Sequence, residues 1–291
     1  MEFAGPVAVV APLVAIAFGL CVGSFLNVVI FRLPRQGLGL NSPRRSFCPS
    51  CQAQLDLRDN IPVVSWLLLR GRCRACRAPI SLRYPLVELA VGCLSFFVFQ
   101  AEGFSLRYLF CFYFLSCLTA VAFIDLELMV IPDLLVRPTC LLGLLSAALF
   151  PHPDLMVGER LWLLLTDIGW SDLLTSLVGA AAAYLAGYFS LWSVSTFYKI
   201  WRGRQGLGDG DPPLMGLIAL FLGLPSILPV LLFSTFIALA SVVVMLITGH
   251  LQKEGLGVKP IPFGPFLSLA AMIWYFRGQA IMSWYLGLLT F

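Results

Sequence analysis

Two aspartates stand out because carboxylates are rare and costly in so apolar a chain. Asp125 follows the apolar run 108–124, and Asp211 ends the glycine-rich stretch 206–211. A carboxylate at the centre of a membrane helix costs about 2.5–3.5 kcal/mol on insertion scales. Two carboxylates at one membrane depth suggest an aspartic-protease arrangement, in which one draws a proton from water and the other, protonated, polarises the scissile carbonyl. Asp125 and Asp211 are therefore the predicted catalytic pair for peptide hydrolysis.

Other aspartates nearby have simpler interpretations. Asp133 follows Ile131-Pro132 at an expected helix start, where the helix dipole favours a carboxylate, so we interpret it as a helix cap. The same dipole would favour Asp211. Asp125 is expected at a helix C-terminus, where its charge is disfavoured, so capping does not explain it. Asp209 remains an alternative to Asp211, because 206–209 also reads Gly-x-Gly-Asp.

Four cysteines form a second cluster that could do chemistry. Cys48 and Cys51, and then Cys73 and Cys76, give the spacing C-x2-C-x21-C-x2-C. Two such pairs supply the four thiolates of a tetrahedral zinc site. Because all four ligands come from the protein, the predicted zinc is structural. Another metal, or thiols without a metal, are the alternatives.

The composition indicates the elements that must position these residues. The chain has 291 residues, of which 59% are hydrophobic and 12% charged, whereas soluble domains carry about 25% charged residues. The long apolar runs must be helices, because lipid offers no partners for backbone N–H and C=O groups. We therefore predict an all-α polytopic membrane protein with about eight transmembrane helices. The expected spans are 7–31, 84–101, 106–124, 131–150, 172–198, 212–224, 227–248 and 264–283.

The positively charged residues predict the orientation of these spans. In the eight-span arrangement, 15 of the 19 Lys and Arg residues, Lys253 and Lys259 among them, fall on one side, in 32–83, 199–211 and 249–263. The segment 151–171 on the other side carries more acidic than basic residues. By the positive-inside rule the first group is cytoplasmic. The predicted domains are 1–31, a first transmembrane span; 32–83, a cytoplasmic four-cysteine zinc-binding domain; and 84–291, a transmembrane aspartic peptidase core.

Several motifs occur together in an order that resembles bacterial type IV prepilin peptidases, the bifunctional leader peptidase/N-methyltransferases, which are membrane aspartic proteases of the GxGD type. The resemblance covers about residues 19–271. It rests on the two Cys-x-x-Cys pairs and on six further motifs: Val22–Val29 with Arg32-Leu33-Pro34, Asn60-Ile61-Pro62, Arg83–Glu88, Ile124-Asp125 with Ile131-Pro132-Asp133, Gly206–Asp211, and Ile261–Pro265. The family's catalytic aspartates map onto Asp125 and Asp211. The family usually has a lysine two residues after the second aspartate, where this chain has Pro213, which leaves the helix start there in question.

The resemblance implies a substrate, a second reaction and a location. The substrates would be type IV prepilin or pseudopilin precursors, cut after a short basic leader at the cytoplasmic face of the bacterial inner membrane. The second reaction would be methyl transfer from S-adenosylmethionine to the new N-terminus. No familiar nucleotide-binding motif is present for that methyl donor. The candidates for its site are the four-cysteine domain and, after it, Glu88.

Two other classes of protein remain as alternatives. The aspartates could form the proton relay of a membrane transporter, or the chain could be a non-catalytic, zinc-stapled membrane scaffold. The expected partners are the lipid bilayer and the precursor proteins. Nucleic acid is not expected, because the basic residues lie beside spans and form no motif that reads RNA or DNA.

Overall fold

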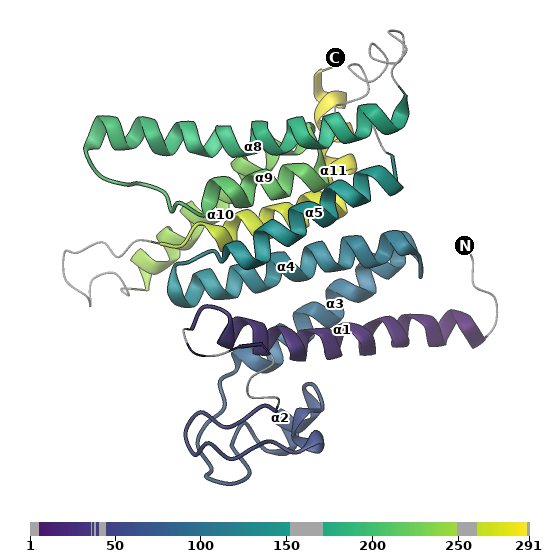
Figure 1. The fold of residues 1–291 in the computed structure, drawn as a ribbon, viewed down its shortest axis with the longest axis vertical. Helices are drawn as coiled ribbons and strands as arrows, with labels where there is room; N and C mark the ends of the chain where they lie inside the picture. The colour runs from purple at the N-terminus through teal and green to yellow at the C-terminus, as the bar shows by residue number, and fades with distance from the viewer. Residues whose placement is uncertain are drawn as a thin grey trace. The chain divides into compact units, whose positions relative to one another are not determined.

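The computed structural model describes residues 6–35, 37, 39–40, 45–151, 171–248 and 261–289. The described residues form helices and no strands, which confirms the predicted all-α fold. Each predicted span has its helix (Figure 1). These helices are α1 Pro6–Arg32, α3 Arg83–Glu102, α4 Leu106–Leu128, α5 Asp133–Leu149, α8 Asp172–Arg202, α9 Asp211–Leu222, α10 Ile227–Ile247 and α11 Gly264–Leu289.

The membrane character of the chain is confirmed by the length and composition of the helices. Within the described residues, five stretches are long and apolar enough to cross a bilayer: Val9–Arg32, Arg83–Glu102, Leu106–Leu128, Asp172–Arg202 and Leu224–Ile247. The apolar helix α9 is shorter. The count of eight spans therefore stays a prediction. Most of the predicted loops 151–171 and 249–263, with Lys253 and Lys259, lies outside the described residues.

The chain divides into two compact units, Met1–Ala120 and Val121–Phe291. In the first unit α1 lies against α3, and the two helices run antiparallel (Figure 1). The Asn27 amide donates a hydrogen bond to the Tyr84 carbonyl oxygen at 3.0 Å, at one end of this helix pair. Gly23 allows the close approach, because a Cβ atom there would lie 2.7 Å from the Cα atom of Glu88.

Residues 33–82, which we call the four-cysteine segment, connect α1 to α3. Within it lie the 3-10 helix η1, Leu57–Asn60, and the short helix α2, Val64–Leu68. Arg32 closes the start of the segment: its buried guanidinium donates to the carbonyl oxygens of Leu40 at 3.0 Å and Arg45 at 3.2 Å. Arg32 thus has a structural role besides its predicted role in topology. The predicted domain limits at 31/32 and 83/84 stay a prediction.

The second unit is built around α9, which is buried on almost every side. This helix contacts α5, α8 and α11. Small residues permit that packing. A Cβ atom on Gly187 of α8 would lie 2.8 Å from the carbonyl oxygen of Met215, and one on Gly216 would lie 3.0 Å from the Tyr184 carbonyl oxygen. Close packing of this kind replaces the hydrophobic effect as the force between membrane helices, and it holds the first residue of α9 in a defined place.

Candidate active site

Asp125 lies in the last turn of α4 and is 5% exposed. Its Oδ2 atom accepts a buried hydrogen bond from the backbone N–H of Gly264 at 3.0 Å. Gly264 is the first residue of α11, so this N–H is one of those that the helix itself leaves without a partner. The N-terminus of α11 therefore supplies the favourable dipole that the C-terminal end of α4 does not give Asp125.

Asp211 is the first residue of α9 and is 4% exposed. Its Oδ2 atom accepts a hydrogen bond from the backbone N–H of Gly208 at 2.9 Å. Pro212 and Pro213 follow in the first turn, where a missing N–H has no intrahelical consequence. The proline in place of the family's usual lysine is thus compatible with a regular start of α9.

Ile131 packs between the backbone segments that lie beside the two aspartates. A Cβ atom on Gly210 would lie 2.7 Å from Ile131 Cβ, and one on Gly264 would lie 3.3 Å from Ile131 Cδ1. One isoleucine therefore contacts both glycine-containing segments that lead to the carboxylates. The charge of Asp125 also acts on the carboxyl group of Asp211, so the two side chains lie close enough to interact electrostatically. Sequence reasoning had included Ile131 and Gly264 in motifs but had given neither a role.

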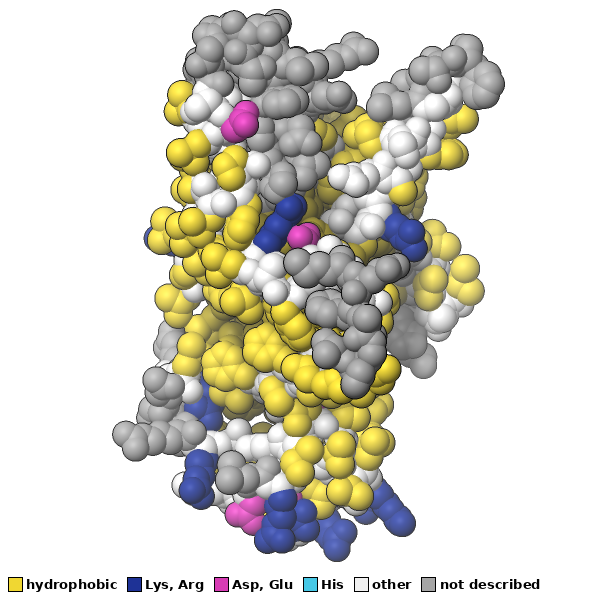
Figure 2. All heavy atoms as spheres, turned by 90° about the vertical axis from the view of Figure 1, so that its right-hand side faces the viewer, with side chains coloured by type: hydrophobic (Ala, Val, Ile, Leu, Met, Phe, Trp, Pro, Cys, Tyr) yellow, Lys and Arg dark blue, Asp and Glu magenta, His cyan; other side chains and the backbone are white. Residues whose placement is uncertain are grey.

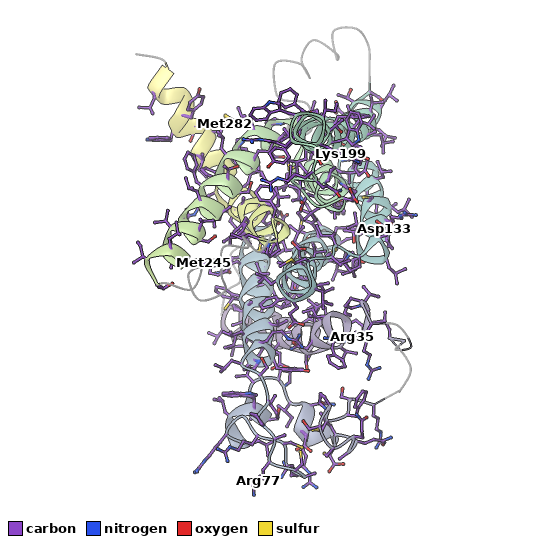
Figure 3. All side chains as sticks on the ribbon, turned by 90° about the vertical axis from the view of Figure 1, so that its left-hand side faces the viewer. Arg35, Arg77, Asp133, Lys199, Met245 and Met282 are labelled. Carbon is purple, nitrogen blue, oxygen red and sulfur yellow. The ribbon has the colours of Figure 1, made fainter. Side chains whose placement is uncertain are left out.

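The alternative aspartates lie in different environments. Asp209 is exposed and accepts a hydrogen bond from the side-chain amide of Gln205. Asp133 lies at the surface in the first turn of α5, with its side chain 64% exposed (Figure 3), and forms an ion pair with Arg137 at 2.6 Å. Pro132 occupies the cap position itself. Asp133 thus lies at the predicted helix start, but its side chain pairs with an arginine and makes no capping hydrogen bond.

The four predicted zinc ligands come together in the four-cysteine segment. The Sγ atoms of Cys48, Cys51, Cys73 and Cys76 all lie within 4.8 Å of one another. The Sγ atoms of Cys48 and Cys76 are 3.8 Å apart, which is about the edge of a tetrahedron with zinc–sulfur bonds of about 2.3 Å. The donor set and its spacing fit a structural zinc ion.

The two cysteine pairs share one backbone geometry. The N–H groups of Cys48 and Cys73 each donate at 2.9 Å to a carbonyl oxygen five residues later. The residue after each second cysteine, Gln52 or Arg77, has a positive φ near 60°. These turns aim backbone N–H groups at the sulfur atoms. Although burial opposes ionisation of Cys48, the N–H groups of Cys51 and Ser50 favour its thiolate and lower its pKa to about 7.

Glu88, the weak candidate for methyl transfer, is buried in the first turns of α3. Its Oε2 atom accepts a hydrogen bond from the backbone N–H of Val63, in the four-cysteine segment, at 2.7 Å. Glu88 therefore joins a predicted membrane helix to the four-cysteine segment. The described geometry assigns it this contact and leaves its part in methyl transfer a prediction.

Comparisons with known proteins identify the family to which the chain is related. A family model described as the bacterial peptidase A24 N-terminal domain matches residues 17–101, and that of the type IV leader peptidase family matches residues 112–244. The second range contains Asp125 and Asp211. Three curated relatives, each named prepilin leader peptidase/N-methyltransferase, illustrate the similarity. The Aeromonas hydrophila protein is 36% identical over 92% of this chain and 91% of its own length. The Stutzerimonas stutzeri protein is 36% identical over 94% and 93%, and that from Pseudomonas aeruginosa is 34% identical over 94% and 93%.

No solved structure matches the chain significantly. The family models cover both the four-cysteine segment and the aspartate pair, and the relatives match over nearly their whole length. The chain therefore belongs to the type IV leader peptidase family.

Proposed function

We propose that this chain cleaves the leader from type IV prepilins or pseudopilins, with Asp125 and Asp211 as its catalytic carboxylates. One observation carries the proposal: two buried aspartates from different helices interact electrostatically, and each has one oxygen held by a glycine N–H. The names of the curated relatives supply the class of substrate.

The proposed reaction is addition of water to the scissile amide. One carboxylate accepts a proton from water while the water oxygen bonds to the carbonyl carbon. The other carboxyl group, protonated, donates a hydrogen bond to the carbonyl oxygen as negative charge develops there. The tetrahedral intermediate then collapses with the C–N bond broken and a proton transferred to the leaving nitrogen. Because glycine N–H groups hold the Oδ2 atoms, the Oδ1 atoms are the ones expected to meet water and substrate.

The relatives' names also support a second activity on the same product. In this proposal the new N-terminal amine of the pilin accepts a methyl group, and S-adenosylmethionine is the donor. Zinc held by Cys48, Cys51, Cys73 and Cys76 would fix the fold of the four-cysteine segment. No residue of the described chain is assigned to methyl transfer itself.

The membrane location fits a precursor whose apolar helix remains in the bilayer. The apolar helices support a multi-pass protein of the inner membrane. The excess of arginine in the four-cysteine segment supports a cytoplasmic position for that segment and for the ends of α4 and α9. A leader in the cytoplasm and a pilin helix among the spans would then place the scissile bond beside the aspartates.

Purified protein in detergent, incubated with a full-length prepilin, tests the substrate class. We expect release of the leader, seen by mass spectrometry, and a methylated mature N-terminus only when S-adenosylmethionine is added. Intact precursor after prolonged incubation would contradict the proposed hydrolysis and favour the transporter or scaffold alternatives. Cleavage without methylation would contradict only the second activity.

A further inference from the structure

The four-cysteine segment carries an apolar patch that the proposed reaction does not use. Its members are exposed although they are among the most apolar residue types. Ile61 and Val64 are each 47% exposed, Leu67 is 60% exposed and Leu68 is 77% exposed. We call these four residues the leaflet patch. None of the described side chains of α2 is buried, so this short helix contributes to the exposed patch and adds no buried side chain to the interior.

The depth of the leaflet patch follows from its connection to the helices of the same unit. Glu88, which accepts from the Val63 N–H, also bonds the side chain of Ser24 on α1. Ser24 lies eight residues before the last residue of α1, which is about 12 Å along the helix axis. Glu88 lies five residues after the first residue of α3, or about 8 Å. The start of α2 thus lies beside both helices, within about two turns of the ends at which α1 finishes and α3 begins, and both helices are long and apolar enough to cross the bilayer.

The backbone on either side of the patch is held in unusual conformations. Val63, just before α2, has a φ of 62°, which is rare for a β-branched residue, and Arg70, just after it, has a φ of 52°. Such conformations persist where surrounding contacts over-determine them. Here the Val63 N–H bonds Glu88, and Trp66 packs on Gly71 and donates to the Ile80 carbonyl oxygen at 3.2 Å. The patch is therefore presented by a defined turn.

The direction of the patch agrees with its depth. Figure 2 views the molecule from the end at which α1 begins. Hydrophobic side chains gather on the face of the four-cysteine segment turned toward that view, and Lys and Arg side chains lie along its edge. Figure 1 shows α2 on the side of the four-cysteine segment nearer the beginning of α1. For a helix that crosses the bilayer, this direction points toward the hydrocarbon.

We propose that the leaflet patch inserts into the lipid leaflet at which α1 ends and α3 begins. Its apolar side chains would then lie at the boundary between headgroups and acyl chains, as those of interfacial segments do. Exposed arginines in the same segment, Arg58, Arg70 and Arg72, complement the phosphates of anionic lipids. The four-cysteine segment is thus held to the membrane surface by lipid contacts as well as by α1 and α3.

Photocrosslinking in the full-length protein tests this insertion. The amino acid p-benzoylphenylalanine replaces Leu68 in one variant and Leu67 in a second, and each protein is reconstituted in nanodiscs of phosphatidylethanolamine and phosphatidylglycerol. The matched control carries the same amino acid at Gln54, an exposed polar position of the same segment that lies outside the cysteine pairs. We expect covalent phospholipid adducts at 67 and 68, about tenfold more abundant than at 54. Retained zinc and leader cleavage verify that each variant folds.

Three outcomes would overturn the proposal. Adducts no more abundant at 67 and 68 than at 54 would show that the patch does not reach lipid. Crosslinks between two copies of the chain would identify the patch as a dimer interface. Crosslinks to a prepilin, formed in place of lipid adducts, would identify it as a substrate surface. Since the lipid adducts need no turnover, they can form whether or not the proposed hydrolysis is correct.

Discussion

At the scale of single residues, the described contacts of the aspartates follow one pattern. Each aspartate has one oxygen bonded to the N–H of a glycine, Gly264 for Asp125 and Gly208 for Asp211. Glycine suits both positions because a Cβ atom would crowd the carboxylate, lying 2.7 Å from Asp125 Oδ2 at Gly264 and 3.3 Å from Asp211 Oδ2 at Gly208. In the proposed reaction each carboxyl group would thus be oriented before substrate arrives, as preorganised catalytic groups are.

Gly264 is predicted to be essential because it has no room for a side chain. A Cβ atom there would lie 2.7 Å from the Oδ2 atom of Asp125. We expect Gly264→Ala to displace that carboxylate and to lower kcat for leader cleavage by roughly 10²-fold, since small misplacements of catalytic groups have effects of that size. Steady-state cleavage of a prepilin measures this.

Gly287 on the same helix offers the matched control, because a Cβ atom there would have open space, with no atom of the described residues within 4 Å. Gly287→Ala should cleave at the rate of the unmodified protein. If Gly264→Ala were equally active, the hydrogen bond to Asp125 would have no part in orienting the carboxylate.

At the residue scale, the sequence indicates a candidate carboxylate but not the backbone groups that contact it. Asp125 could be selected because a carboxylate at a helix C-terminus lacks a local explanation. Its compensation by Gly264 could not be predicted, because the two residues are 139 positions apart and a backbone N–H leaves no trace in residue type. The burial of Asp211 and the exposure of Asp209 likewise depend on the turn of the backbone.

At the scale of elements, the close contact between α8 and α9 fixes the position of α9 and therefore of Asp211, its first residue. Gly187→Ala would place a methyl group 2.8 Å from the Met215 carbonyl oxygen and from the Ala219 side chain. Because the backbone of α9 cannot move aside cheaply, we expect a loss of about 1–3 kcal/mol in stability. Thermal unfolding in detergent, followed by intrinsic fluorescence, measures the loss.

The neighbouring Ala186 is exposed and provides the control for this prediction. Ala186→Leu adds a larger group but should leave the unfolding temperature nearly unchanged. An equal shift for the two variants would mean that the helix contact is not as tight as described.

The four-cysteine segment gives a second prediction at this scale. The protein purified without chelators should contain near-stoichiometric zinc, because the four sulfur atoms are already at tetrahedral spacing. Cys48→Ser should lose most of it, whereas Cys93→Ser, on α3 and outside the cluster, should retain it. Elemental analysis by mass spectrometry checks the metal. A different metal, or none, in the unmodified protein would contradict the zinc assignment.

The elements were more predictable than their contacts. Long apolar runs gave helix positions, since lipid permits few other structures, and the Cys-x-x-Cys spacing gave the sulfur cluster. The positions of the glycines in α8 and α9 indicated close packing only in general terms. Their partners depend on which helices face each other, and in an almost uniformly apolar chain no pattern of polar residues marks the facing sides.

At the scale of the whole molecule, the distribution of charge predicts the topology. Lys199 and Arg202 lie in the last turn of α8, and Arg204 follows in the loop after it. The connection between α3 and α4, in contrast, carries Glu102 and Arg107 at its ends. By the positive-inside rule the first should be cytoplasmic and the second periplasmic. Green fluorescent protein fused to the chain after residue 203 should therefore fluoresce. Alkaline phosphatase fused after residue 104 should be enzymatically active. The reverse result would place the aspartates on the opposite side of the membrane.

The central claim is that Asp125 and Asp211 act together to hydrolyse the precursor, and substitution of each aspartate tests it most directly. Asp125→Asn, Asp211→Asn and Asp209→Asn keep the size of the side chain, and retained zinc and an unchanged unfolding temperature verify the fold. With a full-length prepilin as substrate, we predict that Asp125→Asn and Asp211→Asn each lower the rate of leader cleavage by about 10²–10⁴-fold, while Asp209→Asn cleaves normally. Normal cleavage by Asp125→Asn or Asp211→Asn would contradict the account.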